Sequence, residues 1–407
     1  MKKKAYTPVV YIITKLELGG AQKVCLSLFH ELQKKNHPTW LISGTQGTLA
    51  QSVKDNPNVI LIPSLVRECS WRTIGSEIKT FFTLIKELKK LKTIHPTLIV
   101  HTHSTKAGYL GRWAGLFAGI KERIHTVHGF GFHPYQSRLG YFVAWFLEYL
   151  TSYITTQYVC VSREDIRIGK RLLHNFSKKS SLIRAAIEDH KFYPSTIFKE
   201  SSSTEQSSTL LSEASWHRDK GDVLQLSDTT FIFGAVSCFK KQKNLFDLLH
   251  AFEIVHAQHP HTRLELIGDG VGRPDIEQWI KHKNLAHSVT LHGWVDDVAG
   301  IMRTWHTFVM SSLWEGLPCA AVEARFLTLP VLAYNVGGIK DLIISGQNGF
   351  LYEPQNKQQL AQGMMNLVTD KDLYKKLKLY PEDLSSFTLP AMILDHSFLY
   401  QNLEKNK

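Results

Sequence analysis

The 407-residue sequence has few cysteines and no long apolar run. Its five cysteines are Cys25, Cys69, Cys160, Cys238 and Cys319. An odd number without paired spacing excludes a disulfide framework and a cysteine-based zinc site, and it is typical of reduced thiols in the cytosol. No stretch approaches the ~18 uninterrupted apolar residues that a membrane-spanning helix needs. We therefore expect a cytoplasmic protein.

The N-terminus lacks a full signal sequence, although its basic start, MKKK, resembles one. The apolar residues that follow extend only from Val9 to Ile13, and Gly19-Gly20 comes soon after. A signal peptide needs a longer apolar region, so we interpret this segment as a first β-strand. The chain length predicts two or three domains with a sizeable core.

The excess of positive over negative charge is confined to the first half of the chain. Residues 1–190 hold 27 Lys+Arg and 12 Asp+Glu, whereas residues 191–407 hold 21 and 24. Such a half should be attracted to an anionic membrane surface or to nucleic acid. Nucleic acid is disfavoured, because no Lys/Arg cluster is interleaved with the aromatic side chains on which bases stack. We therefore expect contact with the inner face of the membrane.

Two regions, 8–190 and 230–380, alternate apolar strands with amphipathic helices, which predicts parallel sheets covered on both faces. Between them, residues 195–229 are rich in serine and poor in large apolar residues, which indicates a flexible insertion. The predicted helices of the first region are Gln22–Lys35, Ile74–Leu91 and Thr105–Phe117. The predicted strands are Pro8–Thr14, Thr39–Ser43, Asn58–Ile62, Thr97–Thr102, Arg123–Val127, Gln157–Val161, Ser181–Arg184, Phe231–Val236, Arg263–Ile267, Val289–His292, Thr307–Met310, Pro330–Ala333 and Phe350–Tyr352.

An aromatic-rich segment, residues 135–155, predicts an amphipathic helix. Glu148 interrupts its apolar residues, so the segment is not a membrane span. We interpret it as a core helix, with a helix lying in a membrane interface as the alternative.

The strongest chemical signal lies in residues 307–338, TFVMSSLWEGLPCAAVEARFLTLPVLAYNVGG. A buried strand is followed by a loop with Glu315 and Gly316, and then by a helix that should begin at Pro318. Gly316 allows a ligand to approach the backbone, and the free N–H groups at the helix start favour an anion such as a phosphate. Glu323 lies on the apolar helix, where an isolated carboxylate would be costly to bury.

Two further stretches place polar groups after predicted strands. Gly19-Gly20 follows the first strand, and two glycines there allow backbone N–H groups to approach a phosphate or a sugar. His128 ends the strand in HTVHGFGF, at the sheet edge where ligands bind in open α/β folds. His101, His103 and His125 lie nearby, and we interpret them as hydrogen-bonded filling. A zinc site is disfavoured, because suitable Cys or Asp ligands are missing.

The segment Glu315-x7-Glu323, within SLWEGLPCAAVEA and followed by PVLAYNVGGIKDLI, resembles the donor-binding signature of the retaining, metal-independent family 4 glycosyltransferases. The stretch HTHSTKAGYLGR followed by IHTVHGFGFHP resembles the bacterial surface-polysaccharide branch of that family. The resemblance implies that Glu315 lies at the transferred sugar and that Glu323 holds the ribose. It also implies that Gly316 and Leu317 belong to the donor site, and that His128 faces the reacting sugar.

The same resemblance assigns two more parts of the donor site. Gly19 and Gly20 match a loop that lies over the donor. In Phe239-Lys240-Lys241-Gln242-Lys243, Lys243 matches a lysine that holds the diphosphate. Cys238 occupies the place of an arginine found in many members, and Lys240 could substitute for that arginine.

The resemblance implies the GT-B fold, with two Rossmann-like doubly wound α/β domains that face each other across a cleft. We expect an N-terminal acceptor-side domain at 1–190, a linker and Ser-rich insertion at 191–229, a nucleotide-sugar-binding domain at 230–385, and a C-terminal helix at 386–407 that crosses back to the first domain.

The expected activity is transfer of a sugar from a nucleotide-diphospho-sugar to a glycan or lipid-linked acceptor, in cell-surface polysaccharide or lipopolysaccharide synthesis. The expected enzyme needs no cofactor and no metal, because Lys243 and the helix start at Gly316–Pro318 can stabilise the leaving diphosphate. Two alternatives remain open: a sugar-nucleotide epimerase of the same fold, and a catalytically weak binding protein.

Overall fold

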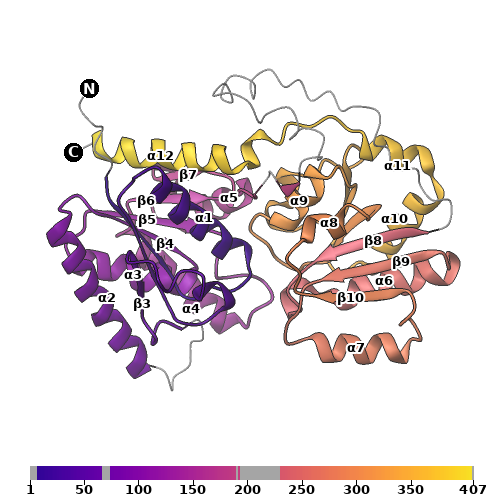
Figure 1. Ribbon diagram of the computed structural model, residues 1–407, viewed down its shortest axis with the longest axis horizontal. Helices are drawn as coiled ribbons and strands as arrows, with labels where there is room; N and C mark the ends of the chain where they lie inside the picture. Colours follow the sequence, from indigo (N-terminus) through magenta and orange to yellow (C-terminus); the bar gives the residue numbers. More distant parts are fainter. Residues whose placement is uncertain (1–6, 67–73, 189–190, 193–229, 406–407) are drawn as a thin grey trace. The chain divides into compact units, whose positions relative to one another are not determined.

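The computed structural model describes residues 7–66, 74–188, 191–192 and 230–405. The chain divides into two compact units, each built on one parallel sheet (Figure 1). The first unit comprises Met1–Ile187, Trp314–Cys319 and Ser385–Lys407, and the second comprises Glu188–Leu313 and Ala320–Leu384. Almost all of the insertion predicted at 191–229 lies outside the described residues.

The first unit contains a seven-stranded sheet in the order β3-β2-β1-β4-β5-β6-β7, with every neighbouring pair parallel. Its strands are β1 (Val9–Ile13), β2 (Thr39–Ser43), β3 (Val59–Leu61), β4 (Ile99–His103), β5 (Glu122–Val127), β6 (Gln157–Cys160) and β7 (Ser180–Leu182). Its helices are α1 (Gly20–Lys34), α2 (Ile74–Ile94), α3 (Thr105–Phe117), α4 (Arg138–Ser152), α5 (Arg163–Leu172) and α12 (Leu389–Lys405).

The central strand β1 shows why this sheet is covered on both faces. All five of its residues are buried, and alternate side chains point to opposite faces. Val10 and Ile12 pack with Leu84 of α2 and Ala107 of α3 in one apolar cluster. Tyr11 points to the other face, where its hydroxyl forms a 2.8 Å hydrogen bond with that of Tyr400 on α12. The face with α2 and α3 is therefore opposite to the face with α12.

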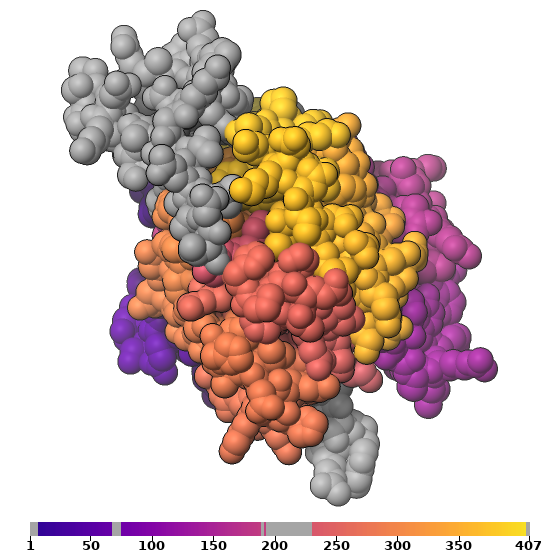
Figure 2. Space-filling model, turned by 90° about the vertical axis from the view of Figure 1, so that its right-hand side faces the viewer, coloured from indigo at the N-terminus to yellow at the C-terminus, as the bar shows by residue number. Residues whose placement is uncertain are grey.

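The second unit contains a six-stranded parallel sheet in the order β10-β9-β8-β11-β12-β13. Figure 2 shows the surface of this unit, where segments drawn in salmon and orange lie toward the viewer. Its strands are β8 (Phe231–Val236), β9 (Thr262–Ile267), β10 (Val289–Gly293), β11 (Thr307–Met310), β12 (Val331–Tyr334) and β13 (Gly349–Tyr352). Its helices are α6 (Leu245–Gln258), α7 (Arg273–His282), α8 (Val298–Met302), α9 (Cys319–Phe326), α10 (Lys357–Thr369) and α11 (Lys371–Lys378).

The strand order reverses direction once in each sheet. In the first sheet this happens between β1 and β4, and in the second between β8 and β11. At such a point the loops that leave the two strands run to opposite sides and leave room for a ligand at the carboxyl ends. The loops after β1, β4, β8 and β11 are therefore the places to look for a site.

Most predicted elements agree with the structure to within two residues at each end. Strands β2, β8 and β11 and helix α3 have the predicted bounds. The prediction that a helix begins at Pro318 was wrong by one residue, because α9 begins at Cys319 and Pro318 immediately precedes it. Pro318 still supplies no N–H group that would need a partner there.

The interpretation of residues 135–155 as a core helix was wrong. The buried residues of α4 are Glu148, Thr151 and Ser152, whereas most of its large apolar side chains are exposed. The side of this helix that packs on the unit carries these polar residues together with the partly buried Trp145 and Tyr149. Among the described helices, none has the length and apolar content needed to cross a membrane.

Candidate active site

At the reversal point of the second sheet, a cationic loop is tied to the end of β11. The loop contains a short 3-10 helix, Lys241–Lys243, after β8. The Ser311 hydroxyl, directly after β11, donates to the backbone carbonyls of Lys243 at 3.1 Å and Asn244 at 2.9 Å. The Leu313 N–H donates to the carbonyl of Gln242 at 2.8 Å. The loop is thus held from the strand that leads to Glu315.

A second loop supports the cationic loop from behind. The N–H of Phe239 donates to the carbonyl of Asp269 at 2.9 Å, and the N–H of Gly272 donates to the carbonyl of Phe239 at 3.0 Å. Gly270 has a φ of +157°, and a Cβ added to it would lie 2.6 Å from the Phe239 carbonyl oxygen. The glycines of Gly268-Asp269-Gly270-Val271-Gly272 therefore allow one loop to approach the other, and sequence spacing alone did not reveal this role.

Glu323 lies on α9, and 9% of its surface is exposed. The same helix carries Arg325, which is buried and pairs with Glu382 at 2.6 Å. Arg325 also donates to the carbonyl of Leu329. This ion pair fixes the C-terminal end of α9 in its unit, so Glu323 projects from a helix with a defined position.

In the first unit, Glu315 and Gly316 lie beside His128. A Cβ added to Gly316 would lie 2.5 Å from the carbonyl carbon and oxygen of His128, so only glycine fits there. Gly129, next to His128, has a φ of +92°, which favours glycine as well. The close backbone approach brings together two residues predicted for the sugar end, Glu315 and His128.

The loops after β1 and β4 also meet. The hydroxyls of Thr14 and Ser104 are 3.1 Å apart. Ser104 has φ +65° and ψ 152°, a backbone conformation that is costly for any residue except glycine and that occurs chiefly at functional sites. Gly19 precedes α1 at the same edge of the sheet, and its carbonyl accepts from the N–H of Lys23 at 2.9 Å. Gly20 is the first residue of α1.

Four histidines line this edge, and hydrogen bonds connect all of them to neighbouring groups. His101 binds the hydroxyls of Tyr400 and Thr126, each at 2.7 Å. His125 binds the Thr102 hydroxyl at 2.9 Å. These two histidines are hydrogen-bonded filling, as predicted.

His103 is buried and hydrogen-bonded as well, but through one ring nitrogen only. Its Nδ1 is 3.0 Å from Nε2 of His128, but its buried Nε2 has no hydrogen-bond partner. Burial lowers the pKa of His128 to about 3. Its imidazole is therefore neutral near pH 7 and can donate to, or accept from, a sugar hydroxyl. His103 holds one nitrogen of that ring.

No group of three or more His, Cys, Asp or Glu side chains within the described ranges could hold a metal ion. The chain contains one Asp-x-Asp spacing, Asp370-Lys371-Asp372. Here Asp370 accepts from the N–H of Leu373 at 2.8 Å and caps helix α11. Its role is structural.

Two family descriptions match this chain. "Glycosyltransferase Family 4" matches residues 18–186, and "Glycosyl transferases group 1" matches residues 218–382. The matches correspond closely to the two regions of alternating strands and helices.

Among curated proteins, the chain is similar to an Escherichia coli UDP-Gal:alpha-D-GlcNAc-diphosphoundecaprenol alpha-1,3-galactosyltransferase. The two are 30% identical over 363 residues, which cover 88% of this chain and 86% of that protein. The chain is also similar to the capsular polysaccharide biosynthesis glycosyltransferase CapM of Staphylococcus aureus, with 24% identity over 84% of this chain and 83% of that one.

Solved structures share the architecture at lower identity. Anabaena HepE in complex with UDP-glucose superposes with a TM-score of 0.73 at 17% identity, covering 97% of this chain and 99% of that chain. The sucrose-phosphate synthase of Thermosynechococcus elongatus gives a TM-score of 0.77 at 18% identity, covering 98% of this chain and 100% of that chain.

Proposed function

The chain belongs to the family 4 glycosyltransferases and has the GT-B fold, and from this premise we propose that it transfers a hexose from a UDP-sugar to a lipid-linked glycan acceptor. The transfer retains the anomeric configuration and needs no metal. One observation carries the proposal: the cationic loop with Lys240 and Lys243 is hydrogen-bonded to the carboxyl end of β11, at the reversal point of the second sheet.

The second unit binds the nucleotide end of the donor. Glu323 accepts hydrogen bonds from the ribose hydroxyls, and Lys243 and Lys240 contact the diphosphate. Gly316 and Leu317 place backbone N–H groups near the start of α9, where the helix dipole favours an anion. Uridine as the base is supported by the UDP-Gal donor of the E. coli relative and by the UDP-glucose complex of HepE.

Catalysis rests on charge that develops as the glycosidic bond breaks. The leaving diphosphate gains negative charge, and fixed cations and backbone N–H groups stabilise it more than they stabilise the bound donor. Lys243 supplies the cation in place of a metal. Glu315 and the neutral imidazole of His128 contact the sugar, and Gly19-Gly20 lies over it.

The acceptor is a lipid-linked glycan at an anionic membrane surface, in cell-surface polysaccharide synthesis. The E. coli relative acts on a diphosphoundecaprenol-linked sugar, and the S. aureus relative belongs to capsule synthesis. The excess of Lys and Arg in residues 1–190 favours such a surface.

Calorimetry with UDP tests the donor site. Glu323→Ala should weaken binding by about 1.5–3 kcal/mol, the value of a hydrogen bond to a charged group. The exposed Glu353 of the same unit is the matched control, and Glu353→Ala should leave the affinity unchanged. Unchanged UDP affinity in a folded Glu323→Ala variant would exclude the ribose role.

Turnover tests the sugar end and separates transfer from the alternatives. Glu315→Gln and His128→Ala should each lower kcat by about 10²-fold or more, with UDP affinity changed by no more than a few-fold, because contacts made in the transition state affect turnover. His261→Ala, at an exposed histidine, is the control. Near-normal transfer in both variants would refute the assignment. If the protein releases an epimerised sugar nucleotide in the absence of acceptor, it is an epimerase. If it binds the donor but shows no turnover, it is a binding protein.

Proton NMR of the product tests retention, since the anomeric coupling constant distinguishes the two configurations. A product with the anomeric configuration opposite to that of the donor would overturn a retaining mechanism.

A further inference from the structure

Helix α4 places its apolar residues in solvent. Six of its large apolar side chains, together with that of Tyr153 just after it, are between 40% and 73% exposed. They recur at spacings of three and four residues, so they form one stripe along the helix, which is about 22 Å long. The stripe consists of Leu139, Phe142, Val143, Phe146, Leu147, Leu150 and Tyr153.

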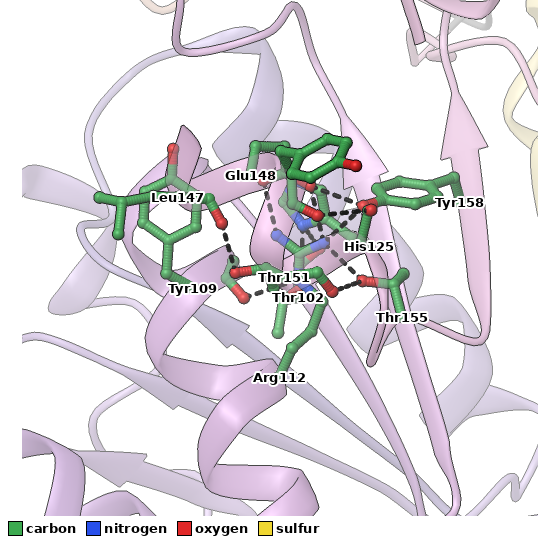
Figure 3. A network of polar contacts seen from close by, with 12 residues as sticks. Thr102, Tyr109, Arg112, His125, Leu147, Glu148, Thr151, Thr155 and Tyr158 are labelled. Carbon is green, nitrogen blue, oxygen red and sulfur yellow. Dashed lines mark hydrogen bonds and ion pairs between the residues drawn. The ribbon is translucent and has the colours of Figure 1, made fainter. Parts of the chain in front are cut away.

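A buried polar network determines which side of α4 faces inward. Arg112 of α3 donates from two nitrogens to the two carboxylate oxygens of Glu148, each at 2.8 Å, and Tyr158 donates to the same carboxylate at 2.7 Å (Figure 3). Both Arg112 and Glu148 are buried. Rotation of α4 would separate this ion pair inside the unit at a high cost, so the apolar stripe stays outside.

The neighbouring helices α3 and α2 also expose large apolar side chains. Trp113 of α3 donates to the Thr151 hydroxyl of α4 at 3.1 Å, which joins these two helices. The Phe117 ring of α3 lies 5.9 Å from that of Phe81 on α2. Phe117 is 59% exposed, and Phe82 of α2 is 64% exposed. Exposed apolar side chains gathered on neighbouring helices of a globular unit mark an interaction site.

Lysines border this surface, and exposed acidic side chains do not accompany the stripe. Helix α3 contains no Asp or Glu, and the one carboxylate of α4, Glu148, is buried against Arg112. Helix α2 exposes four lysines, Lys79, Lys86, Lys89 and Lys90, of which Lys90 pairs with Glu87 of the same helix at 2.8 Å. Lys86 follows the exposed Phe82 by four residues, so the two side chains are neighbours on one side of the helix.

We propose that the surface of α2, α3 and α4 docks on an anionic lipid bilayer, with the α4 stripe inserted at the boundary between headgroups and acyl chains. Exposed apolar side chains on α4, α3 and α2, with exposed lysines on α2, match the two layers of such a membrane, apolar chains and anionic headgroups. This proposal rests on the proposed function in one respect: the lipid-linked acceptor is what brings the protein to a membrane. Binding to vesicles is measured without donor or acceptor, so its failure and failure of sugar transfer are separate results.

The test is co-sedimentation with vesicles of phosphatidylcholine alone or with 30% phosphatidylglycerol, in 50 and 500 mM NaCl. The full chain should bind the anionic vesicles, and part of the binding should persist at high salt. Phe142→Ser/Phe146→Ser should lower the partition coefficient about tenfold or more at both salt concentrations, because each serine removes half-exposed apolar surface. Lys86→Gln/Lys89→Gln should weaken binding at low salt only.

The matched control is Leu394→Ser/Phe398→Ser. These residues are each 54% exposed on α12, on the opposite face of the sheet, and this variant should bind as the wild type does. Hydrogen exchange of α4 should slow on anionic vesicles, and that of α12 should not. Equal binding by wild type and Phe142→Ser/Phe146→Ser would overturn the proposal. So would a wild-type dimer in sedimentation velocity that this variant makes monomeric, because a second copy would then cover the stripe.

Discussion

Lowering the pH from 7 to 5 should destabilise the first unit, because burial lowers the pKa of five of its histidines. These are His101, His103, His125, His128 and His396. Each is neutral when folded and can be protonated when unfolded. The unfolded state therefore binds more protons below about pH 6.5, and the free energy of unfolding falls as the pH drops toward the folded pKa values.

For two of the five histidines, the size of the effect on the free energy of unfolding can be calculated. Burial lowers the pKa of His128 to about 3 and that of His396 to about 4, against ~6.5 in an unfolded chain. At pH 5 both stay neutral in the folded unit, so each lowers the free energy of unfolding by about 2 kcal/mol. Together they remove about 4 kcal/mol, a large part of the 5–15 kcal/mol that is typical of a domain.

A variant of His396 isolates one such contribution. His396 is 1% exposed, its Nδ1 donates to the Met392 carbonyl at 2.8 Å, and its Nε2 has no hydrogen-bond partner. His396→Phe keeps a ring beside His101 and removes the titrating group. Between pH 7 and pH 5 it should lose about 2 kcal/mol less than the wild type. Met392→Leu, at a buried residue on the same helix, should change stability equally at both pH values.

Native-state hydrogen exchange can measure the effect in each unit separately. After correction for the intrinsic exchange rate at each pH, peptides from β4 and α12 report on the first unit, and peptides from β8 and β12 report on the second. The second unit should also lose some stability, because burial lowers the pKa of His306 to about 4. The same pH dependence of β4 exchange in wild type and His396→Phe would refute the reasoning.

Three further predictions concern the interior, the cationic loop and the metal. Glu148→Gln should lower the free energy of unfolding by about 3–5 kcal/mol in urea titrations, because Arg112 then lacks its buried counter-ion; a loss below about 1 kcal/mol would contradict this. Gly270→Ala should weaken UDP binding in calorimetry about tenfold or more, because its Cβ would displace the Phe239 backbone and with it Lys243; unchanged affinity would show that the loops move independently. EDTA should leave transfer activity intact, and activity restored only by added Mg²⁺ or Mn²⁺ would refute metal independence.

The sequence predicted the elements well where one physical pattern dominates. The strand Thr307–Met310 is continuously apolar because a strand of a covered parallel sheet is buried on both faces, and its bounds agree with the structure. The apolar periodicity of α4 is equally clear, but the prediction that its apolar side is buried was wrong. Periodicity shows that a helix has an apolar side, but not that this side faces the protein. Glu148 was interpreted only as an interruption, whereas its ion pair with Arg112 determines the orientation of the helix.

The candidate site shows the same division between sequence and tertiary structure. By itself the sequence determined two α/β regions, the strand-loop-helix unit with Glu315 and Glu323, the cationic loop and the uneven charge, because local composition and spacing carry these signals. Only the tertiary structure decided that Gly316 lies against His128, that the Gly268–Gly272 loop supports Phe239, and that one nitrogen of His103 has no partner. The two loop contacts join segments that are distant in the sequence, and the surroundings of His103 likewise come from several strands and helices. Strand order determines which distant loops meet at one edge of a sheet.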